Sequence, residues 1–238
     1  MGLEEVKILC TICARGGSKG VKGKNLRLVL GKPLIAHTIK TAIDSQIFTD
    51  IAISSDSSEI LDSGIRNGGT LAIKRPDDLA DDYSGKLSAI KHCLLESEKM
   101  VGHAYDMIVD LDVTAPLRIK RDIIDAVNLI KLPNTANVIT GCPARRSPYF
   151  NLVEKLDGDY VKLSKTLDSD CLRRQDSPEC FDMNASIYVW TRDSLLSSDS
   201  VIGSQTRILE MPEDRSVDID TEFDLEVVTL LMERVQNA

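Results

Sequence analysis

Short apolar runs alternate with segments of helical periodicity over the first 142 residues. The runs predict strands at 6–13, 50–55, 70–74, 105–113 and 136–142. Between them, apolar residues recur three or four positions apart, which is the spacing of an amphipathic helix, and predict helices at 33–45, 57–67, 86–100 and 118–130. Strands that alternate with helices predict an α/β fold with a mostly parallel sheet and helices on both faces.

The alternation stops at residue 144. A polar stretch at 164–179 is flanked by hairpin-like segments at 149–156, 160–163 and 186–190. We interpret residues 144–190 as a small β-rich excursion from the main sheet, within a single domain that spans residues 1–238. An amphipathic helix at 221–235 closes the chain, and its apolar positions are Phe223, Val227, Leu230 and Leu231.

Composition and charge limit the partners of the chain. Its 238 residues suffice for one large α/β domain. The net charge of −8 argues against nucleic acid or an anionic membrane surface as a partner. No apolar run approaches the roughly 20 residues of a membrane helix, and the acidic first residues do not resemble a secretory signal. We therefore expect a cytoplasmic protein whose six cysteines are reduced.

A glycine-rich loop at residues 14–25 follows the first predicted strand. Between Gly16 and Lys24 it contains four glycines and three lysines, with Arg15 just before them. Glycine lets backbone N–H groups approach an anion closely, and the basic side chains add charge for a polyphosphate. Neither a Walker A motif nor G-x-G-x-x-G occurs, so the usual dinucleotide fingerprint is absent. The alternative is a solvated surface loop, but in parallel sheets ligands bind at this end of the strands.

Asp218 and Asp220 lie two residues apart in an extended segment, so both carboxylates point the same way while Ile219 faces the core. Mg²⁺ is often held by one or two carboxylates together with phosphates and water. The alternative is a helix cap, in which Asp220 or Thr221 would begin the last helix.

Other polar clusters give weaker signals. Cys10 and Cys13 match C-x-x-C, but residues three apart in a strand face opposite sides, so we interpret them as structural thiols. The three histidines share no ligand spacing. Two basic doublets in the excursion form either a solvated face or a site for an acidic substrate: Arg145 with Arg146, and Arg173 with Arg174.

Seven short motifs, in order along nearly the whole chain, resemble those of the acylneuraminate cytidylyltransferases, the CMP-sialic acid synthetase family. They are A-R-G-G-S-K-G…K-N at 14–25, S-S-D at 54–56, R-P-x-x-L-A-x-D at 75–82, T-A-P-L-R at 114–118, R-Q at 174–175, N-A-S-I-Y at 184–188 and S-V-D-I-D-T-E at 216–222. The resemblance implies a Rossmann-like fold and the reaction of CTP with a nonulosonic acid to give the CMP-sugar and pyrophosphate.

The resemblance also implies roles for individual residues. Arg15 and Lys24 would hold the triphosphate, and Asn25 and Arg75 would contact the cytidine. The implied nucleotide site comprises Ala14, Arg15, Gly16, Gly17, Ser18, Lys24, Asn25 and Arg75. Asp218 and Asp220 would hold Mg²⁺, the implied cofactor, and Asp112, Arg174 and Asn184 would line the sugar site. In the family the excursion mediates a homodimer and reaches the partner's active site, so Arg174 is a candidate contact for the sugar carboxylate, in cis or in trans.

Three departures from the family pattern concern the substrates. Asp112 stands where the family has a sugar-reading glutamine, which exchanges an amide for an acceptor-only carboxylate. Ala185 stands where many members have glycine. Residues 83–86 differ from the small hydroxyl residues that members tend to have near the nucleotide. The first two leave the sugar open, whereas the loop and the acidic pair follow the family.

The reaction expected from these residues is in-line attack of the anomeric hydroxyl of a nine-carbon acid sugar on the α-phosphate of CTP. Arg15, Lys24 and the loop N–H groups would neutralise the departing pyrophosphate, and Mg²⁺ on Asp218 and Asp220 would polarise the phosphoryl group. Asp218 is also a candidate general base. The alternatives are activation of another acid sugar such as Kdo and a nucleotide-binding regulatory module without turnover.

Overall fold

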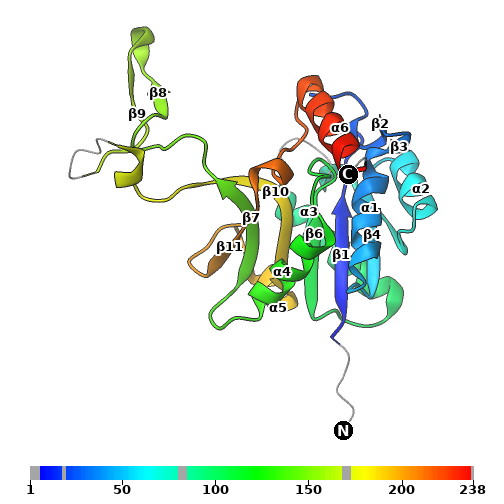
Figure 1. Ribbon diagram of the computed structural model, residues 1–238. Coiled ribbons are helices and arrows are strands. Elements are labelled where there is room, and N and C mark those ends of the chain that lie inside the picture. Colours follow the sequence, from blue (N-terminus) through cyan, green and yellow to red (C-terminus); the bar gives the residue numbers. More distant parts are fainter. Residues whose placement is uncertain (1–5, 18–19, 80–84, 168–172, 237–238) are drawn as a thin grey trace.

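The central feature of the protein is a seven-stranded sheet with the strand order β11-β7-β10-β6-β1-β4-β5 (Figure 1). A computed structural model describes residues 6–17, 20–79, 85–167 and 173–236. All neighbouring strands are parallel except that β10 runs antiparallel to β6 and β7. The strands are β1 Ile8–Cys13, β4 Asp50–Ser55, β5 Leu71–Lys74, β6 Met107–Leu111, β7 Asn137–Pro143, β10 Phe181–Thr191 and β11 Thr206–Glu210.

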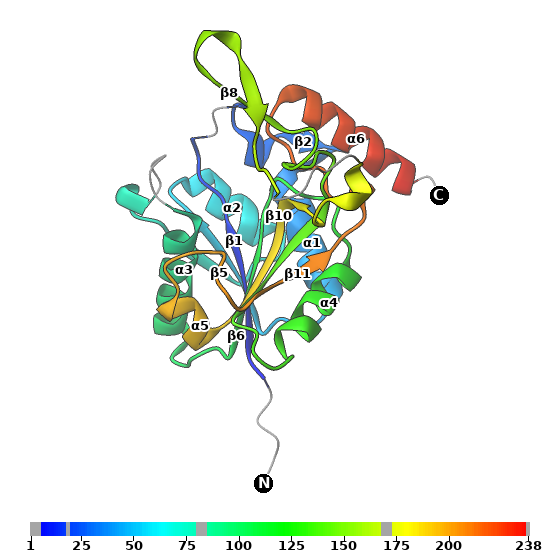
Figure 2. The same ribbon diagram turned by 90° about the vertical axis from the view of Figure 1, so that its left-hand side faces the viewer.

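Helices cover both faces of the sheet, as the sequence predicts. Figure 2 shows α3 and α5 on one side and α1 and α4 on the other. The helices are α1 Leu34–Ser45, α2 Ser58–Arg66, α3 Lys86–Val101, α4 Lys120–Ile130, α5 Arg192–Ser197 and α6 Glu222–Gln236. Two apolar cores result: α1, α2, α4 and α6 contribute to one, and α3 and α5 to the other. Cys10 packs in the first core and Cys13 against the second, so the two thiols face opposite sides of β1.

Residues 186–190 belong to the sheet and not to the excursion, which corrects the predicted range of 144–190. They form the second half of β10, which lies between β6 and β7. Ile187, Val189 and Trp190 are fully buried there. A short apolar run fits a central strand as well as a hairpin, and the hydrogen bonds that decide between them come from strands distant in sequence. The described segment outside the sheet therefore ends before Phe181.

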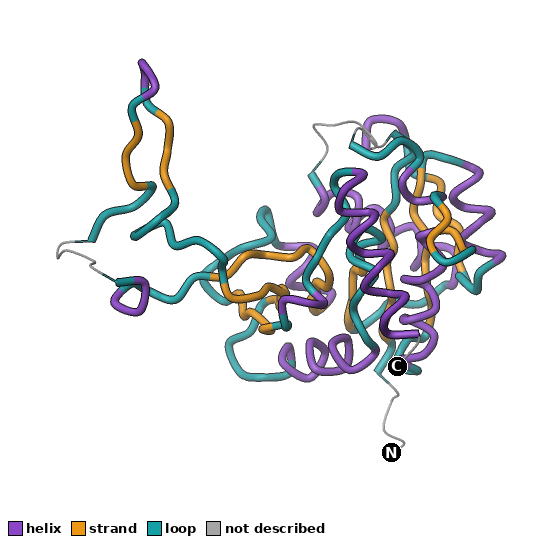
Figure 3. The backbone as a smooth tube through the Cα atoms, turned by 45° about the horizontal axis from the view of Figure 1, so that its top comes forward, coloured by secondary structure: helices purple, strands orange, loops and turns teal. Residues whose placement is uncertain are grey.

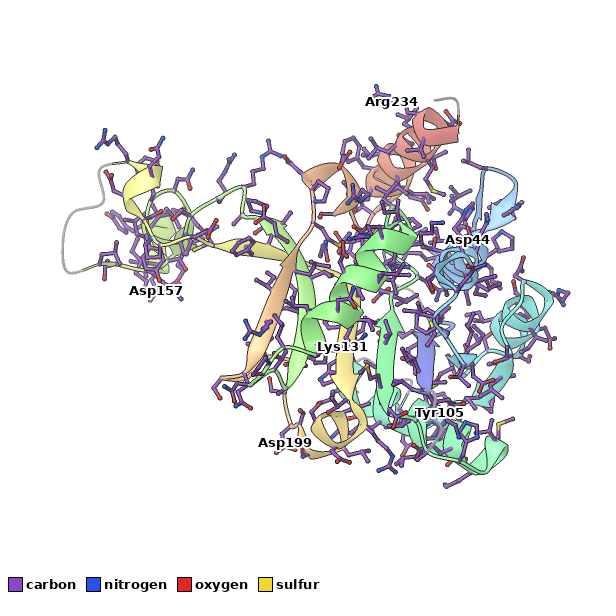
Figure 4. All side chains as sticks on the ribbon, turned by 60° about the horizontal axis from the view of Figure 1, so that its bottom comes forward. Asp44, Tyr105, Lys131, Asp157, Asp199 and Arg234 are labelled. Carbon is purple, nitrogen blue, oxygen red and sulfur yellow. The ribbon has the colours of Figure 1, made fainter. Side chains whose placement is uncertain are left out.

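The excursion projects from the body of the protein on the side where the parallel strands end (Figure 1). It carries an antiparallel hairpin of β8 (Val153–Lys155) and β9 (Val161–Leu163), in which all six residues are exposed. In Figure 3 these two strands stand apart from those of the main sheet. Figure 4 places Asp157 in this projecting part, well apart from Tyr105 in the body.

The buried face of α6 differs from the predicted one. Leu225 and Val228 are buried, whereas Phe223 is 71% exposed and Leu230 59% exposed. Residues 225 and 228 lie three positions apart on one helical face, and residues 223 and 230 lie on another. Which of the two apolar faces of α6 becomes buried depends on how the helix packs against the rest of the protein. No helix in the described ranges is long and apolar enough to cross a membrane.

Ala185 has a left-handed backbone, with a φ of +50°. It lies where the register of β10 against β7 shifts, between Met183 and Tyr188. A Cβ in this conformation costs roughly 1 kcal/mol, whereas glycine adopts it readily. We expect Ala185→Gly to raise the free energy of unfolding by about 1 kcal/mol, seen as a higher urea midpoint with an unchanged slope.

The control for this substitution is Ala126→Gly, because Ala126 is fully buried within α4 and has helical backbone. Glycine there should lower the free energy of unfolding by about 1 kcal/mol. Equal decreases for the two variants would show that position 185 carries no strain.

Candidate active site

The glycine-rich loop and Asp112 flank the point where the strand order reverses. β1 pairs with β4 on one side and β6 on the other, and the chain leaves β1 into the loop and β6 into Asp112. In open α/β sheets this switch point forms a crevice outside the carboxyl ends of the strands. The fold therefore brings together the two segments that the sequence assigns to the nucleotide and the sugar.

The start of the loop is fixed by the residues that follow β4 and β5. The Ala14 N–H donates to the Ser54 carbonyl at 2.9 Å, and the Gly16 N–H donates to Asp56 Oδ1 at 2.8 Å. Arg75, only 5% exposed, donates to the Ser54 hydroxyl and carbonyl at 3.2 and 3.0 Å. Arg75 thus lies at the base of the loop with much of its guanidinium bonded to protein.

The end of the loop closes back on its beginning. The short 3-10 helix η1 (Lys24–Leu26) follows Gly23, whose φ of +62° favours glycine. Buried Asn25 donates from Nδ2 to the Arg15 carbonyl at 2.9 Å. Gly17 has open space on the side where a Cβ would lie. The predicted site residue Ser18 and its neighbour Lys19 lie outside the described residues.

Lys24 joins the loop to the acidic pair across 195 positions of sequence. Its ammonium donates to the Ile219 carbonyl and lies 3.5 Å from Asp220 Oδ1, while its side chain is only 13% exposed. A Cβ on Gly20 would lie 2.0 Å from the Asp220 carbonyl oxygen, so this close approach requires glycine. A bidentate pair from Arg27 to Glu222, at 2.8 and 3.0 Å, supports the same junction.

Ile219 faces the core between Asp218 and Asp220, as the spacing of the acidic pair predicts. Ile219 is fully buried between the two carboxylates, and its N–H donates to the Thr114 carbonyl at 2.8 Å. Asp218 is half-buried; burial and repulsion from the Asp220 carboxylate raise its pKa. Asp220 is exposed and next to Lys24.

The cap of α6 is formed by other residues than the acidic pair. Thr221 Oγ1 accepts from the Asp224 N–H at 3.2 Å, and Asp224 Oδ2 accepts from the Thr221 N–H at 2.7 Å. This reciprocal pair is a capping box. The carboxylates of Asp218 and Asp220 are therefore not needed to begin the helix.

The three predicted sugar residues differ in their surroundings. Asp112 is partly exposed at the end of β6, and its Oδ1 accepts from the Thr114 N–H and hydroxyl at 3.0 Å each. Asn184 is 4% exposed and bonds to Thr140, Ser186 and Ser216, which holds β10 to its neighbours. The backbone of Arg174 lies in a 3-10 turn of the excursion, and its side chain is outside the described part. Their contacts with a sugar stay predictions.

The sequence pattern does not predict that Lys86 pairs with Asp112 and Asp110. Residues 83–86 stand out only as a departure near the nucleotide, and Asp110 is not singled out at all. Lys86 Nζ lies 2.7 Å from Asp112 Oδ2 and 3.1 Å from Asp110 Oδ2. Burial alone would raise the pKa of Asp112, but Lys86, with the hydrogen bonds from Lys86 and Thr114, lowers it to about 2. The one feature of the sequence that could have indicated this charged cluster is Asp110, a carboxylate inside the otherwise apolar strand β6.

Comparison with known proteins agrees with this geometry. Residues 9–224 match the family described as cytidylyltransferase. The post-translational flagellin modification protein B of Campylobacter coli is 45% identical over 226 residues, 95% of each chain. The CMP-N,N'-diacetyllegionaminic acid synthase of Campylobacter jejuni is 43% identical, also over 95% of each chain.

A solved structure points to the same fold. CMP:2-keto-3-deoxy-manno-octonic acid synthetase, complexed with CTP, superposes with a TM-score of 0.68 at 19% identity, over 96% of this chain and 99% of the other. The family match extends from β1 to α6 and thus includes both the glycine-rich loop and the acidic pair. On these grounds the chain belongs to the cytidylyltransferase family.

Proposed function

We propose that this cytidylyltransferase transfers CMP from CTP to a nonulosonic acid and releases pyrophosphate. The observation that carries the proposal is the junction of Lys24 with residues 218–220, because it makes the loop and the acidic pair one site. The names of the relatives at 43% and 33% identity supply the sugar class, since both are CMP-N,N'-diacetyllegionaminic acid synthases.

The nucleotide would bind with its phosphates on the loop. Arg15 and Lys24 supply positive charge, and exposed Gly17, with open space around it, leaves the backbone accessible to the ligand, while the Gly16 N–H is bonded to Asp56. Asn25 and Arg75 lie beside the loop, where the resemblance assigns them to cytidine. Their hydrogen bonds to the Arg15 and Ser54 carbonyls hold these polar groups in fixed positions before a ligand arrives.

The acidic pair fits a magnesium ion by the chemistry of its donors. Asp218 and Asp220 offer carboxylate oxygens, which are hard ligands of the kind that Mg²⁺ prefers, and Asp220 is exposed. No cluster of three or more His, Cys, Asp or Glu ligands occurs in the described chain. One or two carboxylates are what Mg²⁺ takes when phosphates and water complete its shell. When bound, the ion would polarise the α-phosphoryl group.

The protein's own work in the reaction is alignment and charge neutralisation. The anomeric hydroxyl of the sugar attacks the α-phosphorus, the bond to the β-phosphate oxygen breaks, and pyrophosphate leaves. Arg15 and Lys24 stabilise the charge that develops on that leaving group. Asp218 is a candidate acceptor for the hydroxyl proton, because burial and the neighbouring Asp220 raise its pKa.

The experiment that tests the function is pyrophosphate release with CTP, Mg²⁺ and a panel of acid sugars. We expect turnover with N,N'-diacetyllegionaminate, and slower turnover with N-acetylneuraminate and Kdo. The octonic acid synthetase shares the fold at 19% identity, which leaves Kdo less supported than the nonulosonates. A regulatory module would bind CTP and release no pyrophosphate with any sugar, and equal rates with ATP or UTP would contradict cytidine specificity.

We also propose that the protein is a cytoplasmic homodimer whose contact includes the β8–β9 hairpin. Val153, Tyr160 and Val161 are 51%, 74% and 59% exposed on it, and an isolated two-stranded hairpin is only marginally stable in water. A second chain would cover this apolar surface and could place Arg174 in the partner's site. Light scattering of the eluting protein should give twice the mass of the chain, and a monomer at assay concentration would refute the dimer.

A further inference from the structure

Lys86 forms a charged cluster at the carboxyl end of β6. Its ammonium lies 2.7 Å from Asp112 Oδ2, 3.1 Å from Asp110 Oδ2 and 4.4 Å from the centre of the Tyr188 ring. The side chains of Lys86 and Asp112 are 26% and 23% exposed, whereas Asp110 is 1% exposed. The cluster thus has a buried floor and an open edge formed by Lys86 and Asp112.

Helix formation does not explain this lysine. Lys86 is the first residue of α3, where the helix dipole disfavours a positive charge. Burial also favours its neutral form, but attraction to Asp112 and Asp110 outweighs burial and raises its pKa. Asp110 already accepts a hydrogen bond from Thr11 Oγ1 at 2.8 Å. The ammonium is therefore held in place by a set of polar residues in an otherwise apolar part of the sheet.

The open edge of the cluster presents one donor next to one acceptor. Asp112 Oδ1 accepts two hydrogen bonds from Thr114, which use both of its lone pairs. Asp112 Oδ2 accepts one bond from Lys86 and keeps a second lone pair. The ammonium has three N–H groups; one donates to Asp112 Oδ2, while Asp110 Oδ2 lies 3.1 Å away as an ion-pair partner without a hydrogen bond in the described structure.

The cluster lies directly beside the acidic pair. The Thr114 carbonyl, two residues after Asp112, accepts the Ile219 N–H at 2.8 Å. A sugar whose anomeric hydroxyl lies near Asp218 would therefore have its ring next to Lys86.

We propose that Lys86 is a specificity-determining residue of the acid-sugar site, where it and Asp112 together bind a ring or side-chain hydroxyl of the sugar. The hydroxyl would donate to Asp112 Oδ2 and accept from Lys86 Nζ, which lie 2.7 Å apart. A sugar carboxylate has no proton to donate to Asp112 Oδ2 and would be repelled by it, which disfavours that group as the ligand. A neutral group that both donates and accepts fits the cluster. This inference rests on the proposed function and concerns the same site.

The test compares discrimination between a sugar and its monodeoxy analogues in the wild type and in Lys86→Met. With CTP saturating, the wild type should turn over one analogue at least about 100-fold less efficiently, because that analogue covers Lys86 and Asp112 without replacing the hydrogen bonds they lose with water. In Lys86→Met, kcat/KM for the parent sugar should fall about 100-fold. For the same analogue, kcat/KM should be nearly the same in Lys86→Met as in the wild type. The Kd for CTP alone should change less than about threefold, because the contacts of Lys86 are with Asp112, Asp110 and the Tyr188 ring and not with the glycine-rich loop.

Two further variants separate binding from structure. Asp112→Asn keeps the shape of the side chain and should also reduce the discrimination, and Lys86→Arg, which keeps donors, should recover part of the rate. Lys91→Met is the matched control on the same helix, because Lys91 bonds only to the Leu196 and Ser198 carbonyls within the described contacts. It should keep the full discrimination.

Failure of this inference can be distinguished from failure of the proposed function. Suppose that the wild type releases pyrophosphate, but the ratio of kcat/KM between the parent sugar and each analogue is the same in the wild type, Lys86→Met and Asp112→Asn. The inference is then wrong and the proposed function stands. If wild type releases none with any acid sugar while it binds CTP, the proposed function fails and this inference fails with it. Equal losses in sugar and CTP binding would show that Lys86 is only structural.

Discussion

Lys24→Met is expected to lower kcat/KM for CTP by about two to three orders of magnitude, or about 3–4 kcal/mol. The ammonium is 13% exposed and held at the junction of the loop with residues 218–220. From this position it can reach a triphosphate with little reorganisation. Methionine keeps the length of the side chain but removes the charge and the donors. The measurement is pyrophosphate release at saturating sugar, together with the Kd for CTP by calorimetry.

The stability of this variant separates its effect on binding from any effect on folding. The partner carboxylate of Asp220 is 78% exposed, and such pairs contribute little to stability. Lys40→Met is the control for the loss of a lysine–aspartate pair away from the site, because Lys40 pairs with Asp44 on the surface of α1. We expect both variants to unfold near the wild-type midpoint and only Lys24→Met to lose activity. Normal CTP turnover in Lys24→Met would overturn the placement of the triphosphate.

Asp218→Asn is expected to reduce turnover about a thousandfold, or about 4 kcal/mol, and to weaken the response to added Mg²⁺. The amide has the same shape as the carboxylate but cannot supply its charge to a metal ion. A second readout is direct: Mn²⁺ binding in the presence of CTP, followed by electron paramagnetic resonance, should weaken in the variant. The exposed carboxylate of Asp214, in the same segment, gives the control Asp214→Asn.

The same substitution should not destabilise the protein. Burial and Asp220 raise the pKa of Asp218, so the native state disfavours its charged form relative to the unfolded chain. That cost is fully present at any pH above both pKa values, and the neutral amide removes it. We expect an unfolding midpoint at or above that of the wild type. A variant that loses activity because it unfolds would contradict this account of Asp218.

Much of the site follows from local features of the sequence. The glycine-rich loop comes after β1, and a loop in that place lies at the ligand-binding end of a parallel sheet whatever the later strands do. The D-x-D spacing likewise fixes the directions of Asp218 and Asp220 once the segment is extended. The bounds of β4, Asp50–Ser55, coincide with the predicted ones because its apolar run ends at polar residues on both sides.

The rest depends on contacts between residues far apart in the chain. A lysine in a loop carries no sign of its partner 195 positions away, and Lys24 meets the Ile219 carbonyl only when the fold brings the loop to residues 218–220. Lys86 looks like any residue at a helix start until β6 brings Asp110 and Asp112 to it. Electrostatic partners are set by distance in space, and spacing in sequence does not encode that distance.

The sequence by itself therefore determined the α/β class, the position of the loop, the acidic pair and, through its motifs, the family. Only the tertiary structure decided that residues 186–190 complete a central antiparallel strand, that α6 buries Leu225 and Val228 and leaves Phe223 exposed, and that Lys86 lies on Asp112. Local propensity and periodicity act over a few residues, whereas sheet order, the covered helix face and ion pairing result from packing the whole chain.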